Sequence, residues 1–305
     1  GNVTKMVYMF SGCTNLIDLT QLSNWDISKV NAMYAMFLSC KNLSDLTPIA
    51  SWDTTNVTNM SEMFSYCASL TDLSPLTDWD TSNVKDMSKM FLRCTNLTNL
   101  TGLTSWDMSH VTNINSMFAV CPNLTDLTPL AEWNTCMVTN MGGIFSGCTN
   151  LTNLAPLTHW NTDSVTDMYN LFSGCTNLVN LLPIANWNTS KVTAMYRMFS
   201  GCSSLTDLTP IANWDTNNVT NMDYMFYNCK KLVDLIGLEN WDTGNVTSMD
   251  SMFYDCTSLV GSSVLNDWNI SKVTDFSRIF QNCPSHPEFT KRDGSWNNGT
   301  FTPTT

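Results

Sequence analysis

The sequence is poor in charged residues. Asp, Glu, Lys and Arg together make up only 13% of its 305 residues, and acidic residues outnumber basic ones by 26 to 14, for a net charge of −12. A surface of this sign repels phosphate backbones and anionic membrane surfaces. We therefore expect no nucleic-acid binding, and a surface built from Asn, Thr and Ser.

Long apolar runs are also missing. No stretch approaches the roughly 20 apolar residues that a membrane-spanning helix needs, so we expect no membrane insertion, and no signal peptide is visible. The chain begins within a repeat, because GNVTKMVYMF matches the second half of the unit described below. We expect it to be a mature or excised piece.

Catalytic and metal-binding patterns are absent as well. The three histidines, His110, His159 and His286, occupy unrelated positions, and the twelve cysteines form no CxxC pair. No nucleophile–base pair, zinc spacing or phosphate-binding loop stands out. We predict a protein that is not an enzyme and that uses no cofactor and no metal.

The sequence does contain an exact repeat of 27 residues. Phenylalanine stands three residues before each cysteine of the series, from Phe10 to Phe280, and no insertion breaks the frame. A fixed period of this length is typical of a stacked solenoid whose repeats contact only their neighbours. We predict a solenoid of about ten 27-residue repeats over residues 1–283. Tryptophan recurs at 25, 52, 79, 106, 133, 160, 187, 214, 241 and 268, and cysteine at 13, 40, 67, 94, 121, 148, 175, 202, 229, 256 and 283.

Each unit divides into three parts. The apolar spacing from Val57 to Cys67 predicts an amphipathic helix of about two turns. Leu70 to Leu73 predicts a short strand, which Pro75 ends. One short parallel strand, one turn and one short helix per repeat give a leucine-rich-repeat-like solenoid of the α+β class.

The apolar ladders are best explained as core. Methionine recurs at two positions and is replaced there by Ile or Leu, which indicates bulk and not sulfur chemistry. The tryptophans predict a packed column with buried acceptors for their indole N–H groups, a stacking surface for sugars being the alternative. The cysteines predict buried, unpaired thiols, and Cys136 stands alone at a turn position.

Polar columns are the other candidates. Asp or Asn follows almost every tryptophan and precedes the second leucine of each unit. These side chains predict capped turns, with stacked calcium ligands as the alternative. Threonines such as Thr54 and Thr81 leave a flat ice-binding face open as a further alternative, although Ile27, Met108 and Ile270 interrupt their column.

Tyrosine is the variable feature of the unit. All eight tyrosines fall between Val57 and Cys67 or at equivalent positions, off the apolar stripe, where an aromatic ring and a hydroxyl suit recognition; partly buried flanking residues are the alternative. We predict binding residues at Tyr34, Tyr66, Tyr169, Tyr196, Tyr224, Tyr227 and Tyr254. Asn-x-Ser/Thr triplets predict glycosylation in a glycosylating host, at Asn42, Asn56, Asn96, Asn123, Asn218, Asn245 and Asn298.

The two ends differ from the middle. After Cys283 the frame stops, and residues 284–305 carry Phe289, Trp296 and Phe301. Terminal repeats are usually atypical because they must cover the last open face, so we predict a capping segment there. No equivalent segment stands at Gly1, and an open coil at that end predicts self-association.

The run WDTSNV from Trp79 to Val84, followed by the M..MF..C..L..L pattern, closely resembles BspA-type leucine-rich-repeat surface proteins of bacteria such as mycoplasmas, lactobacilli and bacteroidetes. The resemblance covers roughly residues 1–283. It implies an extracellular, cell-surface array that adheres to a host or matrix protein or to a cell-surface glycan, and it carries no specific ligand. The alternative is a structural subunit that assembles head to tail into an extracellular filament, with glycans attached.

Overall fold

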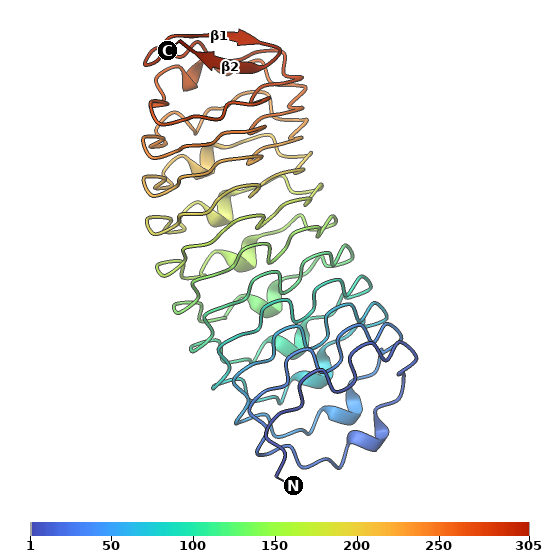
Figure 1. Cartoon of the computed structure of the whole chain (residues 1–305). Helices are drawn as coiled ribbons and strands as arrows, with labels where there is room; N and C mark the ends of the chain where they lie inside the picture. The colour runs from blue at the N-terminus through green and yellow to red at the C-terminus, as the bar shows by residue number, and fades with distance from the viewer. Residues whose placement is uncertain (1, 305) are drawn as a thin grey trace. The chain divides into compact units, whose positions relative to one another are not determined.

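The computed structural model describes residues 2–304. By its internal contacts the chain divides into two compact units, residues 1–161 and 162–305, which are described separately. Within each unit the chain winds into successive coils that lie one above the other (Figure 1). Each coil repeats the one 27 residues before it, and the two are joined by parallel backbone hydrogen bonds.

Regular helices in the described residues are 3₁₀ helices of three residues each. The first unit contains six, one for each of its coils, and the second contains three. Their bounds are η1 (Thr20–Leu22), η2 (Thr47–Ile49), η3 (Ser74–Leu76), η4 (Thr101–Leu103), η5 (Thr128–Leu130), η6 (Ala155–Leu157), η7 (Leu182–Ile184), η8 (Thr209–Ile211) and η9 (Ser263–Leu265).

The helix predicted from Val57 to Cys67 is wrong. Alternate N–H groups in this segment donate to the next coil, and the N–H groups between them close tight turns three residues back. Two turn residues, Glu62 and Tyr66, have φ of 56° and 62°, which an α-helix excludes. The bonds to the next coil run from the N–H of Met60, Glu62, Phe64 and Tyr66 to the carbonyls of Asp86, Ser88, Met90 and Leu92, at 3.0, 2.8, 2.9 and 2.6 Å.

The physical reason is that spacings of three, three, one and three bury one side of two successive turns as well as one face of a helix. An isolated two-turn helix would also leave its first N–H groups without partners. One sequence signal pointed to the turn. At six coils the position of Tyr66 in the repeat is held by Gly or Asn, which tolerate positive φ: Gly12, Gly147, Gly174, Gly201, Asn228 and Asn282.

The strand predicted near Leu70–Leu73 is present only as isolated parallel bridges, such as Asp72 with Asn99. Pro75 does not simply end it, because it lies inside η3, at a position where its missing N–H costs nothing. The predicted fold class is nevertheless confirmed. The chain is a leucine-rich-repeat-like solenoid in which tight turns and a 3₁₀ helix replace a longer helix.

The core consists of like side chains in register. Phe37 and Phe64 stack with ring centroids 5.5 Å apart and planes 4° apart. The tryptophans from Trp52 to Trp268 are at most 5% exposed, and the indole N–H of Trp79 donates to the Ile49 carbonyl at 3.2 Å. The predicted tryptophan column is confirmed, and its rings are too buried to stack on sugars.

The cysteines form a second buried column. None of the twelve is in a disulfide, and all but Cys13, Cys136 and Cys283 are buried. The thiol of Cys94 donates to the Phe64 carbonyl at 3.2 Å, as others do one coil back. Burial raises the pKa of Cys40 to about 11 and that of Cys148 to about 12. Thiols held neutral in this way are small apolar residues and not nucleophiles.

The second unit ends in a hairpin of two antiparallel strands, β1 (Gly294–Asn297) and β2 (Thr300–Pro303). Phe301 packs edge-on against Phe276 at 5.2 Å, and Trp296 packs edge-on against Phe280 at 5.7 Å. The Phe280 N–H donates to the Gly299 carbonyl at 2.8 Å. These contacts are the ones that a cap over the last coil requires. The capping role itself stays a prediction.

Replacement of Val120 by Asn should stabilise the protein. Val120 has φ of 58°, a region that a β-branched residue strongly disfavours, whereas Asn228 and Asn282 hold the same position of the repeat. We expect V120N to raise the free energy of unfolding by about 1 kcal/mol, measured by urea denaturation. Val179, exposed and without positive φ, supplies the control. An equal gain in V179N would contradict the explanation.

Candidate functional site

Five tyrosines gather in the second unit, on the segment that bonds to the next coil. Tyr169 and Tyr196 stack with centroids 5.1 Å apart and planes 7° apart. Tyr227 and Tyr254 stack at 5.1 Å and 10°, and Tyr224 contacts Tyr227 at 5.6 Å. These two groups, the pair Tyr169–Tyr196 and the trio Tyr224, Tyr227 and Tyr254, are together what we call the tyrosine cluster.

The repeat itself brings these rings together. A residue and the one 27 positions later stand in the same place on adjacent coils, so Tyr169 faces Tyr196 and Tyr227 faces Tyr254. Tyr224 precedes Tyr227 by three residues in one pair of tight turns, with φ of 56° at Tyr224. All five are partly exposed. In each stacked pair the rings cover one face of each other, and edges and hydroxyls are left for a partner.

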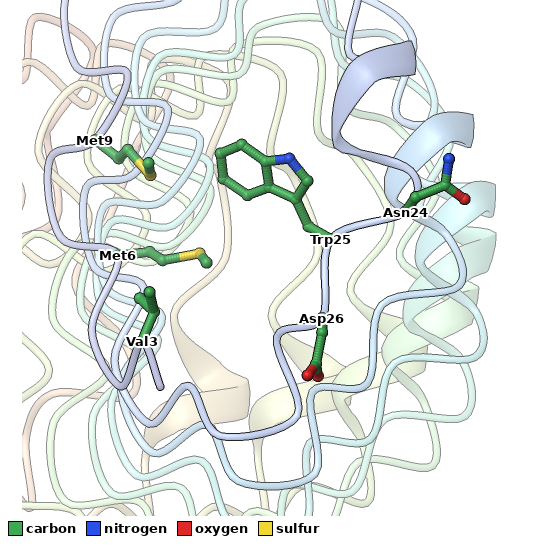
Figure 2. Close-up of a pocket in the computed structure, with 6 residues that line it drawn as sticks. All are labelled: Val3, Met6, Met9, Asn24, Trp25 and Asp26. Carbon is green, nitrogen blue, oxygen red and sulfur yellow. The ribbon is translucent and has the colours of Figure 1, made fainter. Parts of the chain in front are cut away.

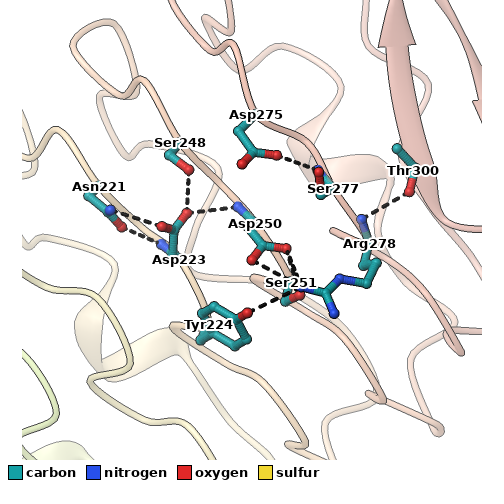
Figure 3. Close-up of polar contacts among 10 residues, drawn as sticks. All are labelled: Asn221, Asp223, Tyr224, Ser248, Asp250, Ser251, Asp275, Ser277, Arg278 and Thr300. Carbon is teal, nitrogen blue, oxygen red and sulfur yellow. Dashed lines mark hydrogen bonds and ion pairs between the residues drawn. The ribbon is translucent and has the colours of Figure 1, made fainter.

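Two arginines hold the cluster in place. The guanidinium of Arg197 lies 4.6 Å from the Tyr224 ring centre. Arg278 donates to the Tyr224 hydroxyl at 3.2 Å and to Asp250 at 3.2 Å (Figure 3). The carboxylate of Asp250 raises the pKa of the Arg278 guanidinium above its usual range. Tyr224 is therefore held by two cations, and the charge of Arg278 is paired with Asp250.

The neighbouring carboxylate of Asp223 is also engaged (Figure 3). It accepts hydrogen bonds from the Ser248 hydroxyl, the Asp250 N–H at 2.8 Å and the Asn221 amide at 2.9 Å. Both of its oxygens are therefore used in contacts within the protein. The arrangement offers fixed aromatic and hydroxyl contacts.

The other two predicted tyrosines do not join a cluster. Tyr34 lies in the first unit against Tyr8, with ring centroids 5.3 Å apart and an edge-on geometry. Tyr66, also in the first unit, lies under the Arg93 guanidinium at 5.3 Å. Within the described residues of that unit, no ring contact joins Tyr34 to Tyr66.

The polar columns cap turns, as predicted. The Asp72 carboxylate accepts the Ser74 N–H at 2.8 Å, at the start of η3, and that of Asp80 accepts the Ser82 N–H at 2.9 Å. Asn takes the same role at other coils, as Asn99 does for Thr101. Among residues 2–304, no group of three or more His, Cys, Asp or Glu side chains could hold a metal ion.

The threonine column is buried and forms no exposed face. Thr54 and Thr81 are 1% exposed, and the Thr54 hydroxyl donates to the Asp80 carbonyl in the next coil at 2.9 Å. The ice-binding alternative is therefore wrong for these residues. Their hydroxyls satisfy the backbone at the turn, where Ile27, Met108 and Ile270 can replace them by filling the same space.

The predicted glycosylation sites fall into two groups. Asn56, Asn123, Asn218 and Asn245 each donate the side-chain amide to a backbone carbonyl one coil back, at 2.7 to 3.0 Å. A glycan on that nitrogen would compete with the hydrogen bond. Asn42, Asn96 and Asn298 are exposed and make no such bond within the described chain.

An open hollow of about 410 Å³ lies at the first described coil of the first unit (Figure 2). Its lining includes Met6, Met9 and Trp25, which in later coils would be covered. Met9 is 50% exposed. Apolar side chains that elsewhere form the core are open to solvent at this coil.

Four segments of the chain, residues 4–126, 96–208, 120–234 and 206–304, match the family model described as "Mycoplasma protein of unknown function, DUF285". The chain belongs to this family. The match confirms the resemblance to BspA-like repeats that the WDTSNV pattern indicated. No curated protein shows significant similarity to this DUF285 chain.

Among solved structures, the chain is similar to a leucine rich cell surface protein from Faecalibacterium prausnitzii A2-165, at 17% identity and a TM-score of 0.34, over 85% of this chain and 82% of that one. It is also similar to a leucine-rich repeat protein from Bacteroides ovatus ATCC 8483, at 15% identity and a TM-score of 0.35, over 85% and 78%. TM-scores this low carry no argument about function. Within residues 2–304, no helix has the length and apolarity that crossing a membrane needs.

Replacement of four capping aspartates by asparagine should flatten the acid dependence of stability. Hydrogen bonds from the residue two positions on lower the pKa of Asp18, Asp80, Asp107 and Asp126. A lowered pKa gives stability that is present above the ordinary value near 3.8 and is lost as the pH falls through the folded value. Asn keeps the acceptor and does not titrate.

We expect the variant D18N/D80N/D107N/D126N to be less stable than the wild type at pH 7, because a neutral amide oxygen accepts a weaker hydrogen bond than a carboxylate, and to lose less free energy of unfolding below about pH 4. Urea denaturation between pH 7 and 2.5 measures this. The corresponding four alanine substitutions, which remove the acceptor, serve as the control and should destabilise at every pH. If the free energy of unfolding of the asparagine variant fell as steeply below pH 4 as that of the wild type, the role of these carboxylates would be refuted.

Proposed function

We propose that this DUF285 chain is a non-enzymatic, extracellular repeat protein that adheres to a macromolecule through the tyrosine cluster of its second unit. The single observation that carries the proposal is the gathering of five partly exposed tyrosines, braced by Arg197 and Arg278, on a rigid array. Tyrosine gives large contact area and a hydroxyl at low entropic cost. The family match and the resemblance to surface repeats support a cell-surface location.

A host or matrix protein fits the cluster better than a cell-surface glycan. Sugar rings bind to open aromatic faces, and one face each of Tyr196 and Tyr254 is occupied, by Tyr169 and Tyr227 at 5.1 Å. The ring edges and hydroxyls that are left suit the carbonyl and carboxylate oxygens of a polypeptide. Tyr34 and Tyr66, outside the cluster, would contribute little.

Loss of the cluster should abolish adhesion. The variant Y196S/Y224S/Y227S carries the serine that other coils place at these positions, as at Ser61, Ser116 and Ser200. We expect at least a tenfold weaker binding to immobilised matrix proteins, about 1.4 kcal/mol or more, measured by surface plasmon resonance. The control Y8S, exposed in the first unit, should bind like the wild type. Equal binding by the triple variant and the wild type would refute the cluster.

The second candidate is self-association into a filament, and the open hollow at Met6, Met9 and Trp25 favours it. Exposed apolar side chains gathered in one hollow are a ready contact for another chain. Light scattering at high concentration should then show assemblies that M9N shifts toward monomer. A monodisperse monomer would rule the filament out.

Glycosylation is proposed at Asn42, Asn96 and Asn298, whose amides are not committed to the neighbouring coil. It requires a glycosylating host. Excess intact mass that disappears on replacement of these three asparagines would support it, and an unmodified mass from such a host would contradict it.

A further inference from the structure

Five large apolar residues of the second unit point away from the core. They are 47% to 67% exposed, although the buried leucines beside them in each coil are fully covered. They have no place in the tyrosine cluster, because they follow the cysteine of the repeat and the tyrosines precede it. We call them the apolar patch: Val179, Leu182, Val233, Ile236 and Val260.

The repeat places them in two adjacent columns. Val179, Val233 and Val260 share one position of the unit, and Leu182 and Ile236 share the position three residues later. Val233 and Val260 stand on adjacent coils, whereas the coil that carries Thr206 and Thr209 separates them from Val179 and Leu182. The Val260 N–H donates to the Val233 carbonyl at 2.8 Å, and Asp234 forms a parallel bridge with Gly261.

The fold does not require apolar residues at these positions. In the first unit the same two columns hold mainly exposed polar residues, such as Thr71, Thr98, Ser74 and Thr101, on coils with the same hydrogen bonds. Ile17, which is 59% exposed, is the apolar exception there. In the second unit Thr206 and Thr209 occupy the coil between. A cluster of exposed apolar side chains that the core does not need marks a contact surface.

Charge indicates what kind of partner covers it. Asp207 and Asp234 lie between the two columns, and each commits an oxygen to a backbone N–H, of Thr209 at 2.8 Å and Ile236 at 3.1 Å. Residues 162–305 contain 14 acidic and 8 basic residues, a formal charge of −6. Lys231 is the nearby cation, since Lys230 pairs with Asp255 at 3.6 Å. A second copy would bring like charges together.

We propose that the apolar patch docks a cationic amphipathic segment of another protein, whose apolar side chains cover the two columns and whose Lys or Arg residues face Asp207 and Asp234. This contact is independent of the tyrosine cluster. It adds a second binding surface to the chain, of different chemistry from the first.

Fluorescence anisotropy with defined peptides tests the proposal on the whole chain. The probe is a labelled amphipathic peptide of Leu and Lys, compared with two versions in which Lys becomes Glu or Leu becomes Ser. We expect the Leu/Lys peptide to bind at least tenfold more tightly than either, because both the apolar contact and the opposite charge are needed. Equal binding of the Glu or the Ser version would overturn the proposal.

The matched variant is V179T/L182T/V233T/I236T/V260T, since threonine is the residue that other coils carry in these columns. It should bind the Leu/Lys peptide at least tenfold more weakly, while Y196S/Y224S/Y227S and the exposed-residue control M137T bind it like the wild type. If circular dichroism shows that the variant with five substitutions does not fold, V233T/I236T/V260T replaces it.

D207N/D234N should weaken binding severalfold and reduce its salt dependence. Undiminished binding by the threonine variant would overturn the proposal. So would dimerisation of the wild type that the threonine substitutions abolish, or binding of the wild type to anionic vesicles through the same residues.

Discussion

Within each unit, the hydrogen bond from alternate N–H groups of one coil to carbonyls 26 residues further on fixes everything else. In the first unit the run from Met33 to Ser39 bonds to residues 59–65 in this way, and the run from Met60 to Tyr66 bonds to residues 86–92. Slippage by a single residue would bring every core side chain opposite a surface one. This constraint on the register explains why the repeat keeps an exact length of 27 residues.

Once the register is fixed, each side chain meets its own counterpart. Phenylalanine stacks on phenylalanine, and the indole of Trp79 and the thiol of Cys94 reach carbonyls one coil back. A substitution is then tolerated when it fills the same space, as Ile114 does in the methionine column. Polar columns obey the same rule, since Asn and Asp both supply the oxygen that caps a turn and only Asp adds charge.

We propose that function lies in the columns that the register leaves free. Positions that neither fill the core nor cap a turn differ from coil to coil, and there Tyr196, Tyr224 and Tyr227 replace serine. The exposed Val233 and Ile236 replace threonine in the same way. Because neighbouring coils place equal positions side by side, a few substitutions at one repeat interval produce a continuous surface. Two surfaces of different chemistry, one hydroxyl-rich and one apolar, arise from one scaffold.

The sequence by itself determined the period, the core columns, the buried tryptophan acceptors and the turn-capping role of residues such as Asp72 and Asp80. These follow from spacing alone, since residues 27 apart must be neighbours in a stack. Only the tertiary structure decided that Val57–Cys67 forms tight turns and no helix, because both bury the same side chains and differ in φ at Glu62 and Tyr66. It also decided which tyrosines meet and which apolar residues face solvent. The direction in which each position of the repeat points depends on its backbone angles, and the spacing of residues in the sequence does not give these angles.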